Sequence, residues 1–297
     1  NGLLTLALRE TSGVDFAVIS MGRLGGEEIG FSSDLDVLWV YQDAGAGDRA
    51  GQIADGIVRD VKKYGEDVLF PLELDAGLRP EGKNGPLVRS LEAYEQYYQR
   101  WALGWEAQAL LRADHMAGDQ GLSERFLEMA APYRYPQEFG ADQVRDIRRI
   151  KARVEAERLP QGTDPSRHLK LGRGSLSDVE WLIQLLQLRH GHTHPEIRTP
   201  STLQALAALS ECGLLASDDA AQLETAWTLA SGIRTALALF GATSTDVLPD
   251  DRVGLEGAAR LMGYPPLSAS TLEDEYLRAT RRARAVFERV FYDNDPR

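Results

Sequence analysis

The sequence predicts an α+β protein, in which a small mixed sheet with backing helices over residues 1–115 is followed by an all-α helical bundle over residues 116–297. Two short apolar runs near the N-terminus flank a glycine-rich turn, a pattern typical of buried strands. From residue 91 onward, apolar side chains instead recur every three or four positions, which is typical of amphipathic helices. A chain of 297 residues with 43% hydrophobic content is long enough to bury two cores of this kind.

The N-terminal part is predicted to begin with a helix at 3–8 and to continue with strands at 16–21 and 35–41. A helical pattern over 49–65 and a third strand over 67–75 follow. Strands and helices in this order predict a small mixed sheet with helices packed against it.

The rest of the chain is predicted to be helical. The first helix of this part reaches about residue 113 and carries an aromatic stripe, which consists of Tyr94, Tyr97, Tyr98, Trp101 and Trp105. We interpret the stripe as core rather than as a stacking platform for adenine. The later helices are predicted at 122–131, 144–158, 176–190, 202–209, 220–240, 255–262 and 272–292.

Candidate catalytic residues follow the glycine-rich turn between the first two strands. Asp34 and Asp36 flank Leu35, and alternation along a strand points both carboxylates to one face, with Cα atoms about 7 Å apart. Two anions so placed repel each other unless a hard cation such as Mg²⁺ lies between them. The alternative is an ordinary strand–turn–strand unit with a solvated pair of aspartates.

A third acid, Asp75, ends the third predicted strand. If this strand pairs beside the one that carries the first two acids, three carboxylates meet at one sheet edge. Such an arrangement is the outline of a two-metal site for nucleotidyl transfer.

The turn itself has residues that suit a triphosphate. Gly22, Gly25 and Gly26 let the backbone approach a bulky anion, and Ser32 and Ser33 supply hydroxyl donors. We therefore expect phosphate groups to bind at this turn, beside the metal.

Composition limits the classes of partner. The chain has 33 basic and 45 acidic residues, a net charge of −12 and a pI near 5.0, which argues against a nucleic-acid binder and favours a protein partner. The single cysteine, Cys212, leads us to exclude disulfides and thiolate metal sites within the chain and to expect a reducing, cytoplasmic location. No apolar run is long enough for a membrane span and no signal peptide is recognisable, so we expect no membrane association. The start at Asn1, without Met, suggests an excised fragment.

Two helical segments are locally basic in this acidic chain. The basic residues are Arg145, Arg148, Arg149, Lys151 and Arg153 in one segment and Arg278, Arg281, Arg282, Arg284 and Arg289 in the other. One interpretation is a solvated helix surface with Glu155, Glu157 and Glu288 as partners. The other is a surface that docks an acidic partner or phosphates.

Three histidines, His190, His192 and His194, lie within five positions after a predicted helix. With no acid or cysteine recognised nearby, we interpret this segment as an exposed loop rather than as a zinc site.

Four ordered motifs resemble the glutamine synthetase adenylyltransferases, which are nucleotidyltransferases similar to DNA polymerase β. The motifs are Gly-Arg-Leu-Gly-Gly-x-Glu-x-x-x-Ser-Ser-Asp-Leu-Asp at 22–36, Asp-x-x-Leu-Arg-Pro-Glu-Gly at 75–82, Trp-Glu-Ala-Gln-Ala-Leu at 105–110 and Lys-Leu-Gly-Arg-Gly-Ser-Leu-Ser-Asp-Val-Glu-Trp at 170–181. The resemblance covers nearly the whole chain. It is strongest to the C-terminal, adenylylating half of actinobacterial members, and it leaves the roles of Asp178 and Glu180 open.

The resemblance implies a nucleotidyltransferase domain over 1–115, with ATP as substrate and a two-Mg²⁺ site. The implied reaction transfers AMP to a tyrosine of glutamine synthetase and releases pyrophosphate. Asp34, Asp36 and Asp75 would hold the metal ions, and Asp75 is also the candidate base for the tyrosine proton. Phosphorolytic removal of AMP from the same tyrosine and a non-catalytic nucleotide-sensing module remain alternatives.

One departure from the related nucleotidyltransferases concerns Arg23, which follows Gly22 where those proteins have Ser or Gly. We expect its guanidinium to contact the triphosphate; the alternative is a surface pair with Glu27 or Glu28. Arg79 and Lys83 are further candidates for phosphate or target binding. The family resemblance makes glutamine synthetase the expected partner and a PII signalling protein a candidate regulator.

Overall fold

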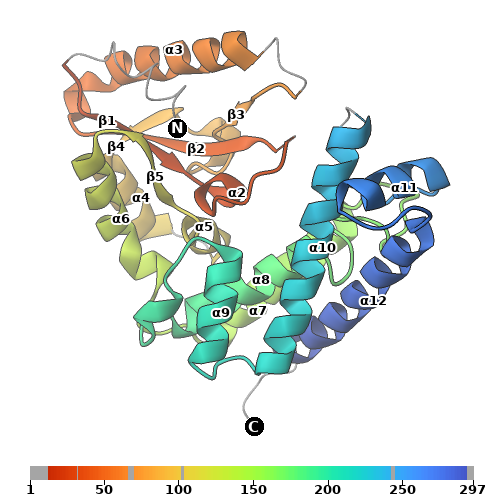
Figure 1. Ribbon diagram of the computed structural model, residues 1–297. Helices are drawn as coiled ribbons and strands as arrows, with labels where there is room; N and C mark the ends of the chain where they lie inside the picture. The colour runs from red at the N-terminus through yellow and green to blue at the C-terminus, as the bar shows by residue number, and fades with distance from the viewer. Residues whose placement is uncertain (1–12, 32, 66–69, 102–103, 242–244, 293–297) are drawn as a thin grey trace. The chain divides into compact units, whose positions relative to one another are not determined.

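The computed structural model describes residues 13–31, 33–65, 70–101, 104–241 and 245–292 (Figure 1). Its contacts divide the chain into two compact units. Unit 1 comprises Asn1–Glu138, Gly191–Thr193 and Arg198–Ser201, and unit 2 comprises Phe139–His190, His194–Ile197 and Thr202–Arg297. The predicted helix at 3–8 lies outside the described residues. The boundary predicted at 115/116 differs from this division, because it falls inside a strand of unit 1.

Unit 1 contains a five-stranded mixed sheet. The strands are β1 (Phe16–Ser20), β2 (Leu35–Tyr41), β3 (Leu74–Asp75), β4 (Val88–Ser90) and β5 (Asp114–Gly118). The order is β3-β2-β1-β5, with β4 also paired to β2; β1 is antiparallel to β2 and β5, whereas β3 and β4 run parallel to β2. The predicted mixed sheet is confirmed. Within 70–75, however, only the last two residues form a strand, and β4 and β5 were not predicted.

Helices cover both faces of this sheet, as Figure 1 shows for unit 1. They are α2 (Gly22–Gly25), α3 (Gly47–Gly65), α4 (Leu91–Trp101), α5 (Gly104–Leu110) and α6 (Gln120–Arg134). On one face, Ile57 of α3 shares a core with Val37 and Trp39 of β2. On the other face, Leu38 of β2 shares a core with Phe126 of α6. Both faces of β2 are therefore buried, which explains its nearly continuous apolar sequence.

The aromatic stripe is core in part. Tyr94 and Tyr98 of α4 are buried at 0% and 3% exposure, and the Tyr94 hydroxyl donates to the carbonyl of Trp39 at 3.3 Å. The core interpretation is confirmed for these two residues and wrong for Trp101, which is 65% exposed. Trp101 is the last residue of α4, whose buried residues are Tyr94 and Tyr98.

Unit 2 is helical, as predicted. Its helices are α7 (Ala141–Glu157), α8 (Leu176–His190), η4 (Pro195–Ile197), α9 (Thr202–Glu211), α10 (Ser217–Gly241), α11 (Arg252–Leu261) and α12 (Ala269–Phe287), with a π-helical turn at Glu288–Tyr292. Helix α8 is buried almost all round, since Leu182, Ile183 and Leu188 lie on different sides of it and are each at most 1% exposed. It therefore forms the centre of this unit and packs against α7, α9, α10 and α12. No helix within the described residues is long and apolar enough to cross a membrane.

Asp178, in the first turn of α8, lies at the centre of a buried ionic network. Its Oδ1 accepts from Lys151 Nζ at 2.6 Å, and its Oδ2 accepts from Arg284 Nη1 at 2.9 Å. Glu155 completes the network, 3.0 Å from each of the two cations. The side chains of Lys151 and Asp178 are each 1% exposed. Two cations and two carboxylates thus balance inside unit 2.

This network corrects part of the interpretation of the basic helices. Lys151 and Arg284 are not on a solvated surface, since they join α7 and α12 to α8 through Asp178. Arg145, by contrast, is exposed and pairs with Asp142 on the same helix, as a solvated face predicts. Burial opposes ionisation of Glu155, but the two neighbouring cations outweigh it and hold the pKa of that carboxyl below its ordinary value.

Candidate active site

The register between β2 and β3 brings two of the predicted acids together. The two strands are parallel, with Leu35 opposite Leu74 and Asp36 opposite Asp75. Side chains opposite each other in a sheet point to the same face, and neighbouring strands lie about 4.8 Å apart. Leu35 and Leu74 pack in the core beneath α3, so alternation directs both carboxylates to the other face. The prediction that Asp75 lies on a strand adjacent to the Asp34–Asp36 strand is confirmed.

Asp34 is the residue directly before β2, which begins at Leu35. The amide of Leu35 donates to the carbonyl of Glu73 at 2.8 Å, so the ladder continues to this point. Asp34 is exposed, whereas Asp36 and Asp75 are half-buried. Asp36 and Asp75 thus lie partly buried at one lip of the sheet, where β2 and β3 pair, and Asp34, the residue before β2, is the exposed one of the three acids.

Asp75 has one carboxylate oxygen held and one available. Its Oδ1 accepts the backbone N–H of Gly77 at 2.7 Å. Among the described residues, no hydrogen-bond partner is assigned to Oδ2. Mg²⁺ prefers oxygen ligands such as carboxylates, so the three aspartates fit this ion.

Gly22 is required by the position of Asp36. Its φ is +52°, and a Cβ at this position would lie 2.3 Å from Asp36 Oδ2 and 3.0 Å from Asp36 Cγ. The amide of Met21 also donates to the carbonyl of Asp36 at 2.8 Å. The short helix α2 thus begins directly against the second acid, where sequence reasoning expected only a turn.

Replacement of Gly22 with alanine is expected to displace the Asp36 carboxylate. The left-handed backbone costs a non-glycine residue about 1–2 kcal/mol, and the overlap with Oδ2 adds to this cost. Urea unfolding should report a loss of about that size or more, and the Gly51→Ala variant, whose added Cβ meets no atom within 4 Å, is the matched control. Equal stability of the two variants would contradict this role of Gly22.

Gly25 and Gly26 have a packing role that sequence reasoning missed. A Cβ on Gly25 would lie 1.7 Å from the carbonyl oxygen of Arg112, and one on Gly26 would lie 2.7 Å from Arg112 Nη1. Arg112 is buried, donates to Glu28 Oε2 at 2.6 Å and to the carbonyl of Pro200 at 2.5 Å. That these two glycines bind phosphate stays a prediction. Their close packing against Arg112 by itself explains why glycine is needed at both positions. The one sequence feature that could have indicated this packing is Glu28, a charged residue inside the glycine-rich stretch, which pairs with the buried Arg112.

Ser33 keeps a donor for a ligand. Its Oγ accepts the backbone N–H of Gly30 at 3.0 Å, and its own amide donates to the Gly30 carbonyl at 3.1 Å. An accepting hydroxyl still has its proton to donate. The local turn therefore fixes Ser33 while leaving it able to bind an anion.

Arg79 holds the loop that follows β3. Its Nε donates to the carbonyl of Gly85, its Nη1 to that of Ala76 and its Nη2 to that of Lys83, at 3.2, 2.8 and 3.3 Å. Its role toward phosphate stays a prediction, and the loop contacts are an alternative reason for this arginine. The side chain of Lys83 is exposed, and Arg23 is half-buried in α2.

The third motif lies inside unit 1. Glu106 is 3% exposed and accepts the hydroxyl of Tyr97 at 2.8 Å. Burial and this hydrogen bond raise the pKa of Tyr97. Through Glu106, the motif thus links α5 to α4.

Comparison with known proteins places this geometry in a family. Residues 4–129 match the family model of glutamate-ammonia ligase adenylyltransferase, and residues 147–291 match that of GlnD PII-uridylyltransferase. The chain is 55% identical over 292 residues to the bifunctional glutamine synthetase adenylyltransferase/adenylyl-removing enzyme of Leifsonia xyli subsp. xyli, which covers 98% of this chain and 29% of that protein.

Proteins of the same name from Streptomyces avermitilis and Mycobacterium leprae are each 49% identical, over 98% and 93% of this chain and 30% and 28% of theirs. The chain therefore spans less than a third of the length of these relatives. By this evidence the chain belongs to the glutamine synthetase adenylyltransferase family.

Proposed function

We propose that this chain transfers AMP from ATP to a tyrosine hydroxyl of glutamine synthetase and releases pyrophosphate. The observation that carries the proposal is the in-register pairing of Asp36 with Asp75, with Asp34 at the exposed end of the same lip. The names of the relatives support the choice of glutamine synthetase as target. The matched part makes up less than a third of those relatives, so the proposal concerns the residues of this chain alone.

Asp34, Asp36 and Asp75 are the residues that would hold two Mg²⁺ ions. When bound, the ions supply charge stabilisation for the attacking and leaving oxygens. Asp75 also accepts the proton of the tyrosine hydroxyl, which has an ordinary pKa near 10 and needs a base at neutral pH. In the balanced step, the tyrosine oxygen bonds to the α-phosphorus, the bond to the bridging oxygen breaks, and pyrophosphate leaves.

The glycine-rich stretch binds the leaving phosphates in this proposal. Ser33 donates its hydroxyl proton, and Arg23 donates through its guanidinium, which forms two parallel hydrogen bonds where serine forms one. Gly22 has the separate task of admitting the Asp36 carboxylate. Lys83 is exposed on the loop after β3 and is available to the phosphates or to the target.

The direct test is incubation of the chain with Mg²⁺, unmodified glutamine synthetase and ATP labelled at the α-phosphate. Label on the glutamine synthetase tyrosine supports the proposal, and its absence with folded protein overturns it. The adenylyl-removing activity in the names of the relatives makes phosphorolysis a second candidate. It is tested with adenylylated glutamine synthetase and phosphate, where ADP is the product.

The Arg23→Ala variant is expected to raise the KM for ATP about 10- to 150-fold, because the loss of a charged hydrogen bond costs about 1.5–3 kcal/mol. The KM for glutamine synthetase should stay near its starting value. Arg145→Ala, which removes an exposed arginine of α7, is the matched control. Unchanged ATP kinetics in folded Arg23→Ala would show that this side chain does not bind the triphosphate.

We also propose that unit 2 binds a PII signalling protein. The match of residues 147–291 to a PII-uridylyltransferase model supports this partner. Titration calorimetry with a purified PII protein tests it, and the absence of heat from binding, with and without ATP, would contradict it.

A further inference from the structure

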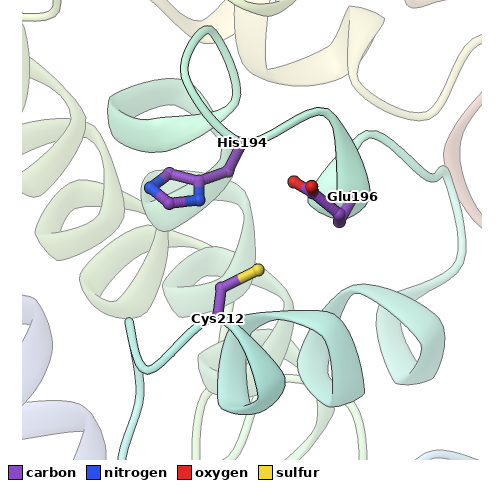
Figure 2. A group of neighbouring side chains, drawn as sticks. All are labelled: His194, Glu196 and Cys212. Carbon is purple, nitrogen blue, oxygen red and sulfur yellow. The ribbon is translucent and has the colours of Figure 1, made fainter.

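Three side chains of unit 2 that can ligate a metal converge on one another. They are His194, directly before η4, Glu196, within η4, and Cys212, directly after α9. One ligand atom from each lies within 4.8 Å of the other two. Figure 2 shows the imidazole, the carboxylate and the thiol directed toward a common space. Sequence reasoning excluded a thiolate site because it did not bring Cys212 to the histidines.

The backbone that carries His194 and Glu196 is held in place. The amide of His194 donates to the carbonyl of His190, the last residue of α8, at 2.9 Å. Ile197, which ends η4, is fully buried, and its carbonyl accepts Gln187 Nε2 at 2.8 Å. The two ligand positions are therefore anchored to α8, the central helix of unit 2.

The backbone at Cys212 is equally constrained. Its amide donates to the carbonyl of Ala208 at 2.9 Å, which extends the helical hydrogen bonds of α9. Gly213 then adopts φ +70°, and the amide of Leu214 returns to the carbonyl of Leu209 at 2.9 Å. This helix ending fixes the Cys212 backbone.

The chemistry of the three groups selects a borderline-soft divalent ion. Imidazole, thiolate and carboxylate are the three ligand types of Zn²⁺, whereas Mg²⁺ and Ca²⁺ take oxygen ligands. Bond lengths of about 2.0–2.3 Å to a tetrahedral Zn²⁺ separate neighbouring ligand atoms by about 3.3–3.8 Å. The ligand atoms lie within 4.8 Å of one another, so the cluster has to contract by at most about 1–1.5 Å. His194 and Cys212 are half-buried and Glu196 is exposed, which leaves room for that movement and for a water.

Charge also favours a cation here. Binding requires the thiolate, so the Cys212 proton leaves to solvent as the metal–sulfur bond forms. The thiolate and the Glu196 carboxylate then neutralise the two charges of Zn²⁺. The net charge of −12 further favours the approach of a cation.

We propose that His194, Glu196 and Cys212 bind one Zn²⁺, with water as the fourth ligand, and that the ion ties η4 to the C-terminal end of α9. The site is independent of adenylyl transfer, and its test does not depend on that activity.

The test uses Co²⁺ as a spectroscopic substitute for Zn²⁺ in the purified chain after removal of metal by a chelator. Cys212 is the only cysteine in the sequence, so a thiolate-to-cobalt charge-transfer band can arise only from this residue. We expect the band in the wild-type chain, its displacement by Zn²⁺, and its loss in Cys212→Ser. His194→Ala should weaken Co²⁺ affinity by at least about tenfold.

His192→Ala is the matched control, because this histidine lies in the same loop, is exposed and is outside the cluster. It should keep the wild-type band. A second readout is alkylation of Cys212 by iodoacetamide, which Zn²⁺ should slow in the wild-type chain and much less in Glu196→Gln. Absence of the band in folded wild-type chain, or equal loss of affinity in His192→Ala and His194→Ala, would overturn the site.

Discussion

Asp36→Asn and Asp34→Asn are each expected to lower AMP transfer to glutamine synthetase by about 10²–10³-fold, which corresponds to about 3–4 kcal/mol of transition-state stabilisation. Each substitution removes an anionic oxygen at the lip where β2 and β3 pair. The amide keeps the size of the side chain, so folding stability should change little. In the chain without metal, loss of one negative charge even relieves repulsion between the acids.

The measurement is the initial rate of label transfer from ATP at saturating Mg²⁺, with urea unfolding of each variant in parallel. Asp55→Asn is the matched control, since Asp55 is an exposed acid of α3 in the same unit. Its rate should equal that of the wild-type chain. Retention of most activity in either Asp34→Asn or Asp36→Asn would remove the metal-ligand assignment from that residue.

Asp178→Ala is expected to destabilise unit 2 by about 3–5 kcal/mol, because it removes the more deeply buried of the two carboxylates that Lys151 and Arg284 share and leaves them only Glu155. Lys151 is the more severely affected, since its side chain is 1% exposed and water cannot replace the lost partner. The Oδ2 atom of Asp178 also accepts the amide of Gly174 at 2.6 Å, so the loop before α8 loses a hydrogen bond as well.

The free energy of unfolding from urea titration, followed by circular dichroism, measures this loss. Asp142→Ala removes a carboxylate from an ion pair on the exposed face of α7, and it should change stability by less than about 0.5 kcal/mol. If the two variants were equally stable, the buried network would contribute nothing beyond a surface pair. The motif around Asp178 would then need a functional explanation.

The sequence by itself determined the class of fold and most of the helices. Apolar residues at helical spacing predicted a helix at 144–158, which the structure has at Ala141–Glu157, because a helix buries a stripe that recurs along its own length. The same local reasoning placed Asp34 and Asp36 on one face of a strand, since alternation is a property of the strand alone. A strand with Asp75 beside the strand of Asp34 and Asp36 was also predicted, and β3 pairs with β2 in this way.

Only the tertiary structure decided what each site residue touches. β4 has only three residues, and β5 contains Asp114, His115 and Gly118 and is mostly exposed, so neither has an apolar run that predicts a strand. They become strands because β2 and β1 provide hydrogen-bonding partners. The contact of Gly22 with Asp36 and the bond between Lys151 and Asp178 join positions that no sequence period relates. The convergence of Cys212 with His194 is of the same kind. The pattern of apolar residues along one segment predicts which face of a helix or strand a residue lies on. The residue that it contacts on that face depends on how distant segments of the chain pack together.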